Sequence, residues 1–441
     1  MKRTQKATAP THLPKWSLLV LRRLHNAMKH HEATGPLASG KANRNGMSGE
    51  KPATAVEPTL GGFGLYIHWP FCVSKCPYCD FNSHVADAVD QLAWQKALLR
   101  ELHYYGSITK GRRLSSVFFG GGTPSLMLAE TAAALLDALS QYWSVDEDVE
   151  VTLEANPSSS ECKHFSDFRE VGVNRISIGV QSLNDKALAF LGRAHTGDQA
   201  LQAVLDAQRV FDRVSFDLIY ALPNQGRDDW ENELETALAL GVNHLSLYQL
   251  TIERGTPFYT EHRNGAFLLP SADEAAELYQ LTTDVTANAG FDSYEVSNYA
   301  KFGHKCRHNL IYWNCGDYVG IGPGAHGRLT LGGGRTRTEQ VPGPKNWLSA
   351  VQLEGHATRL SEPISIIERI DEYFMMGLRL REGIDRGLFE KAMGRSLEEC
   401  VNMGKVEAFQ SEGLIQVDLA GLRATDIGRL RLNSLIVEIV H

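Results

Sequence analysis

Apolar and polar positions follow two different periods along most of the chain, from residue 64 onward. Short apolar runs of strand length stand at residues 65–71, 116–119, 149–153, 175–180, 214–219 and 244–250. Between them apolar residues recur at three- and four-residue steps, which predicts helices over residues 89–106, 128–143, 184–192, 198–211 and 229–240. Strands that alternate with helices form parallel βαβ units. We therefore expect an α/β fold, a partial TIM-type barrel of (β/α)6 form, with its chemistry on the loops after the strands.

The pattern changes after the sixth expected strand. A helix over 273–289 and a strand near 293–296 are expected first, and a Gly-rich segment covers 316–343. Helical spacing returns at 364–378, 387–393 and 401–412, before a β-hairpin within 413–425. This order favours a smaller C-terminal α+β module of winged-helix type; a helical cap on the barrel is the alternative. We expect the barrel over 61–300, the Gly-rich segment over 301–360 and the C-terminal module over 361–441.

The formal charge of −8 is unevenly distributed along the 441 residues. Residues 1–60 hold ten Lys or Arg and three acidic residues, so the remaining chain carries 34 basic and 49 acidic side chains. Because phosphate binding needs clustered Lys and Arg, this acidic body argues against a nucleic-acid substrate. No apolar run approaches the roughly 20 residues of a transmembrane span. Seven cysteines without a secretory signal favour a reducing compartment, and we expect the cytoplasm.

The first 60 residues allow two interpretations. Residues 13–24 are amphipathic and carry arginines, which is compatible with a transit peptide and a mitochondrial location. Residues 33–60 are rich in Gly, Ala, Ser, Thr and Pro, which is typical of a disordered leader. We favour a basic, disordered leader over 1–60, because transit-peptide composition alone is a loose test.

Three cysteines follow the first expected strand with the spacing Cys72-x-x-x-Cys76-x-x-Cys79. Three thiolates on one loop can hold three irons of a [4Fe–4S] cluster and leave the fourth iron open, whereas an electron-transfer cluster takes four cysteines. A structural zinc site needs a second pair of ligands, and a redox CxxC pair leaves Cys72 unexplained. The loop resembles that of the radical S-adenosylmethionine (SAM) superfamily, where SAM fills the open position.

Candidate ligand-binding groups follow the next expected strands. The glycines of Gly120-Gly121-Gly122-Thr123-Pro124 let the backbone approach a ligand closely. Glu154 can accept hydrogen bonds from ribose hydroxyls, although a surface carboxylate or a helix cap stays open for it. Gln181 can donate and accept, and Arg193 can clamp a carboxylate. Asp217 lies within the fifth strand and needs a partner, because an unpaired buried carboxylate is costly.

One histidine motif lies beyond the barrel. His308-Asn309-Leu310-Ile311-Tyr312-Trp313 precedes a second Gly-rich stretch, Gly320-Ile321-Gly322-Pro323-Gly324. A lone histidine is usually structural, but imidazole is also a common axial ligand of haem iron. No CxxCH motif is present, so haem attachment of the cytochrome c kind is not expected.

Taken together, these motifs resemble the HemW family of haem chaperones, which is related to the oxygen-independent coproporphyrinogen III dehydrogenase HemN. The resemblance runs from about residue 62 to the C-terminus. It implies that Cys72, Cys76 and Cys79 are cluster ligands. It implies SAM contacts at Tyr66, Tyr78, Gly121, Gly122, Thr123, Glu154, Gln181, Arg193 and Asp217. It implies a haem-binding motif made by His308, Asn309, Tyr312 and Trp313.

One departure from the dehydrogenase favours a chaperone. The dehydrogenase has a fourth cysteine two positions after the third, and Phe81 stands there in this chain. The resemblance therefore implies a protein that carries a [4Fe–4S] cluster and SAM, binds haem and transfers it to an acceptor apo-haemoprotein. A coproporphyrinogen III dehydrogenase, or another radical SAM oxidase of porphyrin biosynthesis, is the alternative. Whether SAM is cleaved, whether a second SAM binds and whether a homodimer forms stay open, and no residue is assigned a catalytic role.

Overall fold

The computed structural model describes residues 60–86 and 88–440. The basic leader expected over residues 1–60 therefore lies outside the described residues, apart from Leu60. No described helix is both long enough and apolar enough to cross a membrane.

The described residues contain one sheet of twelve strands, in the order β14-β13-β12-β11-β1-β4-β5-β6-β7-β8-β10-β9. Its seven central strands are parallel neighbours: β11 (Asp317–Ile321), β1 (Phe63–Trp69), β4 (Arg113–Gly121), β5 (Ser144–Ala155), β6 (Arg175–Gln181), β7 (Arg213–Tyr220) and β8 (His244–Gln249). The six expected strands and the partial barrel are confirmed. Strands β4 and β5 are longer than expected, because Arg113–Leu114 pairs with Ser144–Val145 ahead of the acidic residues that interrupt the apolar pattern.

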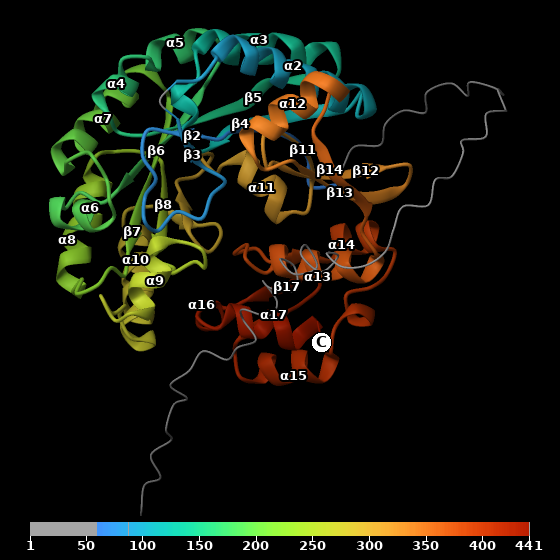
Figure 1. Cartoon of the computed structure of the whole chain (residues 1–441). Coiled ribbons are helices and arrows are strands. Elements are labelled where there is room, and N and C mark those ends of the chain that lie inside the picture. The colour runs from blue at the N-terminus through green and yellow to red at the C-terminus, as the bar shows by residue number, and fades with distance from the viewer. Residues whose placement is uncertain (1–59, 87, 441) are drawn as a thin grey trace, which may run out of the picture.

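Helices cover the outer face of the parallel strands, as Figure 1 shows. They are α2 (Gln91–Ile108), α3 (Ala129–Ala138), α4 (Ser159–Cys162), α5 (Phe165–Glu170), α6 (Asp185–Phe190), α7 (Gly197–Val210), α8 (Arg227–Ala239), α9 (Pro257–Arg263) and α10 (Ala272–Asn288), with 3-10 turns η1 (Pro124–Leu126) and η2 (Leu139–Gln141). Helix α2 begins where Asp90 accepts a hydrogen bond from Ala93 N–H, and it buries Trp94, Leu98 and Leu102.

The parallel strands carry apolar side chains toward the helices and polar side chains toward the barrel interior. On β1, Leu65, Ile67 and Trp69 are fully buried in the core that the helices cover. On the neighbouring strands β5 to β8, polar residues lie opposite each other across the sheet, such as Glu154 opposite Ser177 and Asp217 opposite Ser246. Because side chains alternate between the two faces of a strand, this period of two gives the barrel a polar interior.

The chain after β8 extends the sheet at both edges. The strand expected at 293–296 is wrong in its bounds: β9 (Asp292–Ser293) and β10 (Asn298–Ala300) flank a bend, where the Glu295 carboxylate accepts hydrogen bonds from Ser297 N–H and Asn298 Nδ2. The Gly-rich segment supplies β11, β12 (His326–Leu331) and β13 (Gly334–Gln340). The flanking elements are α11 (Arg307–Trp313), α12 (Pro344–Glu354) and β14 (Thr358–Pro363).

The C-terminal helices and hairpin form a second layer with a core of its own, below the sheet in Figure 1. The helices are α13 (Ile366–Gly377), α14 (Arg386–Met393), η3 (Glu398–Cys400), α15 (Met403–Ser411), α16 (Asp426–Arg429) and α17 (Leu432–Val440). A small sheet joins β15 (Ile384–Asp385), β17 (Gly421–Ala424) and β16 (Ile415–Val417). The Arg328–Glu372 ion pair, 2.9 Å between Nη2 and Oε1, connects this layer to β12.

Candidate cofactor site

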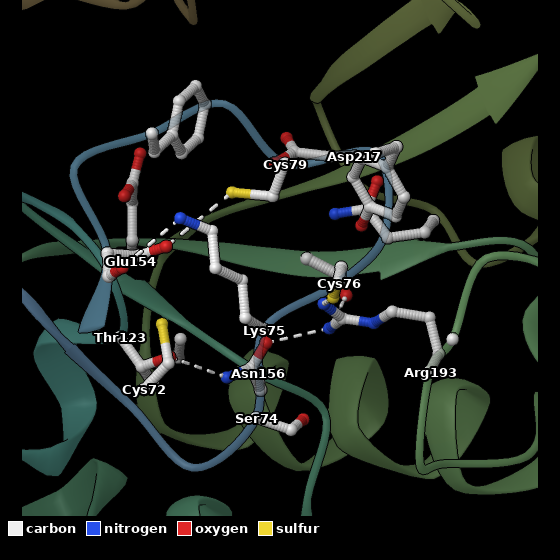
Figure 2. Close-up of a pocket in the computed structure, with 18 of the residues that line it drawn as sticks. Cys72, Ser74, Lys75, Cys76, Cys79, Thr123, Glu154, Asn156, Arg193 and Asp217 are labelled. Atoms are coloured by element: carbon white, nitrogen blue, oxygen red, sulfur yellow. Dashed lines mark hydrogen bonds between the residues drawn. The ribbon is translucent and has the colours of Figure 1, made fainter. Parts of the chain in front are cut away.

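A cavity of about 690 Å³ opens at the carboxyl ends of the parallel strands. One wall is the cysteine loop, which connects β1 to α2, and the other walls are the residues at or after the ends of β4 to β8. Figure 2 shows the three cysteines of the loop facing Glu154, Arg193 and Asp217 across this cavity. The strand order of the barrel thus brings together groups that stand far apart in the chain.

The cysteine loop holds three free thiols at one cavity. Cys72 ends β2 (Phe71–Cys72), which pairs with β3 (His84–Val85), and Cys79 N–H donates to the Cys76 carbonyl at 3.2 Å. Burial raises the pKa of the Cys72 and Cys79 thiols. A bound iron opposes that shift, because metal coordination deprotonates a thiol. Among the described residues, no group of three or more His, Cys, Asp or Glu could hold a single metal ion, but three separate thiols at one cavity fit a multi-iron cluster.

The glycines after β4 bring its backbone against the cysteine loop. Gly121 has a φ of +117°, and a Cβ there would lie 2.6 Å from the His68 ring. A Cβ on Gly122 would lie 2.7 Å from the Phe71 carbonyl and 3.0 Å from Cys72 Sγ. Gly122 N–H and Thr123 N–H donate to Trp69 O and Phe71 O. A side chain at Gly122 would therefore push the cysteine loop away, and one at Gly121 would displace His68 of β1.

A chain of polar side chains joins two of the cysteines. Thr123 Oγ1 donates to Cys72 Sγ at 3.5 Å and accepts from Asn156 Nδ2 at 3.0 Å. Asn156 Oδ1 in turn accepts from Arg193 Nη2 at 2.7 Å, and Arg193 Nη1 donates to Cys76 Sγ at 3.4 Å (Figure 2). Asn156 was missing from the expected site, although it lies two residues after Glu154 in the same motif.

Two carboxylates share the polar interior. Glu154 Oε2 accepts a hydrogen bond from Gly121 N–H at 3.2 Å, and burial followed by the charge of Asp217 raises the pKa of Glu154 to about 8. Burial raises the pKa of Asp217 to about 6. The expected partner of Asp217 is found, because its carboxylate accepts from the hydroxyls of Ser177 and Ser246. The two raised pKa values differ, so near neutral pH Glu154 favours the protonated form and Asp217 the ionised, hydrogen-bond-accepting form.

Other expected contact residues also border the cavity. Tyr78 lies beside Phe258, with ring centroids 6.3 Å apart. Gln181 borders the cavity with a φ of +70°, at a register shift between β6 and β7. Tyr66 differs, because it does not line the cavity: it is half-buried below it, and its hydroxyl donates to His68 Nδ1 at 2.9 Å.

The structure does not bring the histidine motif into this cavity. His308, Asn309, Tyr312 and Trp313 all lie on α11, and His308 contacts Ser116 near the amino end of β4. Ser116 stands five residues before Gly121 on β4, so the motif lies toward the amino end of the strand, with the rings of Phe118 and Tyr66 beside His308. Helix α11 closes the amino-terminal end of the barrel, where Arg307 N–H and His308 N–H donate to Glu150 Oε1.

The His308 ring has partners on both nitrogens. Nδ1 lies 2.8 Å from Ser116 Oγ, Nε2 lies 2.7 Å from the Tyr312 hydroxyl, and the ring stacks on Phe118 at 5.0 Å. Only 1% of the residue is exposed, and burial lowers the pKa of His308 to about 3. In this conformation neither nitrogen is open to an iron.

Comparisons with known proteins agree with the geometry. Residues 66–237 match the Radical SAM superfamily, and residues 364–431 match the HemN C-terminal domain. The chain is 40% identical over 423 residues to Radical S-adenosyl methionine domain-containing protein 1, mitochondrial, of Bos taurus, covering 94% of this chain and 96% of the relative. It is 37% identical over 387 residues to heme chaperone HemW of Escherichia coli strain K12, covering 86% of this chain and 98% of the relative.

The solved structure of coproporphyrinogen III oxidase (HemN) from Escherichia coli, a radical SAM enzyme, has the same fold. Its TM-score is 0.71 at 22% identity, over 85% of this chain and 89% of that one. A superfamily match on the cysteine barrel, a HemN-type C-terminal domain and full-length alignment to HemW lead to one conclusion. The chain belongs to the radical SAM superfamily and, within it, to the family of the HemW haem chaperones.

Proposed function

We propose that this protein is a haem chaperone, which holds a [4Fe–4S] cluster and SAM in the cavity and transfers haem to an acceptor apo-haemoprotein. The observation that carries the proposal is the alignment with heme chaperone HemW over 98% of that protein's length. Phe81 adds support from the site. Its side chain is 62% exposed at the mouth of the cavity, at the position where the dehydrogenase has its fourth cysteine.

The residues of the cavity fit the two cofactors. Cys72, Cys76 and Cys79 would bind three irons, and hydrogen bonds from Thr123 and Arg193 to two of the sulfurs would stabilise the thiolates. A cluster held by these cysteines would be able to supply an electron, with SAM at the iron that no cysteine binds. On the opposite wall, the backbone carbonyls of the glycine segment, whose N–H groups have protein partners, and the carboxylates of Glu154 and Asp217 would accept hydrogen bonds from SAM.

Haem binding through the histidine motif stays a prediction. For His308 to reach an iron, the ring would have to leave both of its hydrogen bonds and its stack on Phe118. Haem titration of the wild type and of His308→Ala tests this point. An unchanged Soret shift in a folded variant would remove His308 from the haem site, and a lost shift would support it.

The experiment that tests the proposed function uses anaerobically reconstituted protein. We expect the wild type to bind haem with a Soret shift, and Cys76→Ala to lose the visible absorption of the cluster while it still binds haem. The absence of a Soret shift in the wild type would overturn the chaperone. The same wild-type protein is then given coproporphyrinogen III, SAM and a reductant. Formation of protoporphyrinogen IX would overturn a chaperone-only function in favour of the dehydrogenase.

The compartment depends on residues 1–60. We keep the cytoplasm as the proposed location, and the name of the Bos taurus relative supports the mitochondrial alternative. A fluorescent protein fused behind residues 1–60 and expressed in eukaryotic cells separates the two. Diffuse cytoplasmic fluorescence supports the first location, and import into mitochondria supports the second.

A further inference from the structure

The far end of the cysteine loop is tied to a distant part of the chain through Asn82. Asn82 Nδ2 donates to Pro323 O at 2.8 Å and to Pro342 O at 3.0 Å. Asn82 Oδ1 lies 3.0 Å from His84 Nε2, which is the donor because an amide oxygen can only accept. Both hydrogens of the amide nitrogen and the amide oxygen therefore have partners. The residue stands three positions after Cys79 and 241 residues before Pro323.

The backbone of Asn82 is held as well. Its carbonyl lies 2.9 Å from His68 Nε2, so this nitrogen carries the hydrogen and donates it. His68 Nδ1 then accepts from the Tyr66 hydroxyl at 2.9 Å. Burial lowers the pKa of His68 to about 4, which keeps the ring neutral and this donor order intact. Strand β1 thus holds the same loop residue from below.

One partner of Asn82, Pro323, lies in a turn whose two flanking glycines have no room for a side chain. A Cβ on Gly324, whose φ is +71°, would lie 2.5 Å from Asn82 Nδ2. A Cβ on Gly322, whose φ is +94°, would lie 2.3 Å from His68 O. The turn is fixed from behind, where the buried Glu101 carboxylate of α2 accepts Gly322 N–H at 2.7 Å. The second glycine motif of the sequence is therefore a seat for the cysteine loop.

The loop between its two anchored ends is exposed. Its start is held by the β2–β3 pair and by the backbone of Gly122 and Thr123. Val73 is 72% exposed and Phe81 is 62% exposed. Between them the loop is held at its middle, where Phe258 N–H donates to Pro77 O at 3.0 Å and the Tyr78 ring packs beside Phe258. The stretch from Cys79 to Asn82, beyond these contacts, therefore depends on the Asn82 anchor.

We propose that Asn82 is the positioning residue of the cluster: it fastens the carboxyl end of the cysteine loop to the Gly322–Gly324 turn and thereby slows loss of the cluster. The proposal rests on the cluster that the proposed function places in the cavity. Asn82 contacts no thiol and is not a ligand. Asn82 acts on the cluster indirectly: it holds the backbone at the end of the cysteine loop in one conformation, and that backbone positions the thiols.

The test compares Asn82→Ala with Asn174→Ala. Asn174 also uses its amide to hold backbone, with Nδ2 donating to Val149 O at 2.7 Å and Oδ1 accepting from Val151 N–H at 2.9 Å, but it lies at the amino end of β6. Both variants are reconstituted anaerobically, and loss of the visible cluster absorption is followed after addition of an iron chelator. We expect Asn82→Ala to lose its cluster about tenfold faster than the wild type, the effect of the two hydrogen bonds to Pro323 and Pro342 that fasten the loop, worth about 0.7 kcal/mol each. We expect Asn174→Ala to keep the wild-type rate.

Two further variants separate positioning from a general loss of stability. Asn82→Asp keeps the shape and the acceptor but loses both donated hydrogens, so it should resemble Asn82→Ala. Gly324→Ala displaces the amide from the other side and should also hasten cluster loss. Thermal melting of the cluster-free proteins checks that each variant is folded. Equal cluster lifetimes in folded Asn82→Ala, Asn174→Ala and wild type would overturn the proposal. A wild type that holds the cluster but binds no haem would refute only the chaperone function.

Discussion

Glu154→Gln should change how the stability of the cluster-free protein depends on pH. In the native protein, burial and then the charge of Asp217 raise the pKa of Glu154 from 4.5 to about 8. Between pH 4.5 and about 8, the folded state therefore keeps a proton on Glu154 that the unfolded chain releases. The stabilisation is complete below pH 4.5 and is lost as the pH rises through about 8. Glutamine carries no titrating proton, and its Oε1 can still accept from Gly121 N–H.

The size of the effect follows from the two pKa values. One pKa unit corresponds to about 1.4 kcal/mol, so the full difference is worth roughly 5 kcal/mol between low and high pH. Over the accessible range from about pH 5 to about pH 8, we expect the unfolding free energy of the wild type to fall by about 3 kcal/mol more than that of Glu154→Gln. Asp217, with a pKa raised to about 6, adds a smaller fall in the same direction.

Urea unfolding of the cluster-free proteins across this pH range measures the difference. The dependence on urea concentration must stay the same in both proteins, so that a shifted midpoint reports stability. The exposed Glu412→Gln serves as the control, because it removes a carboxylate far from the barrel interior and should follow the wild type at every pH. If Glu154→Gln shows the same slope against pH as the wild type, the native carboxyl is already ionised and the reasoning fails.

Two further predictions concern the framework around the cavity. His308→Phe keeps a ring to stack on Phe118 but leaves the hydroxyls of Ser116 and Tyr312 without the imidazole. We therefore expect the free energy of unfolding to fall by about 2 to 4 kcal/mol, measured as a lower melting temperature. An unchanged melting temperature would contradict these contacts. In Glu101→Gln the new N–H₂ replaces one of the two carboxylate oxygens, so it faces either the Ala357 N–H, which Oε1 accepts, or the Gly322 and Trp347 N–H groups, which Oε2 accepts. Placing donor against donor should cost about 1 to 3 kcal/mol, whereas unaltered urea unfolding would refute the pairing.

Much of the barrel could be predicted from the sequence, because its strands and helices are local patterns. Apolar runs located all six expected strands, and helical spacing located the helices between them except the short α4 and α5, which lie between β5 and β6 and were not expected. The edges of the sheet were harder. Strand β12 holds two isolated leucines and β13 alternates Arg and Thr, on either side of Gly332-Gly333, so no apolar run marks them. Their pairing with each other and with β11 and β14 supplies the hydrogen bonds that the pattern does not show.

The candidate site divides in the same way. The three cysteines stand seven positions apart at most, and their spacing alone predicts a shared site. Asn156 and Asn82 were not predicted, because a single polar residue has no period and its partner is far along the chain. Asn82 meets Pro342 across 260 residues, and Arg193 meets Cys76 across 117. Such contacts follow from the closure of the barrel, which brings the ends of all strands to one edge.

The alternation of inward and outward side chains along β1 explains how one strand contacts both ends of the barrel. Gly64, Tyr66 and His68 share the inner face of the strand, since side chains two apart point the same way. A Cβ on Gly64 would lie 3.2 Å from His308 Nδ1, the Tyr66 ring lies 6.3 Å from that of His308, and His68 donates to Asn82 O. One strand face therefore contacts the histidine motif at its start and the cysteine loop at its end. A TIM barrel filled by branched apolar residues has a closed core, whereas these inward residues are small or polar, so the interior is shaped to hold ligand-binding groups. Every second residue of these strands points into the barrel. The polar residues at those positions are therefore the part of the sequence that most directly indicates function in this family.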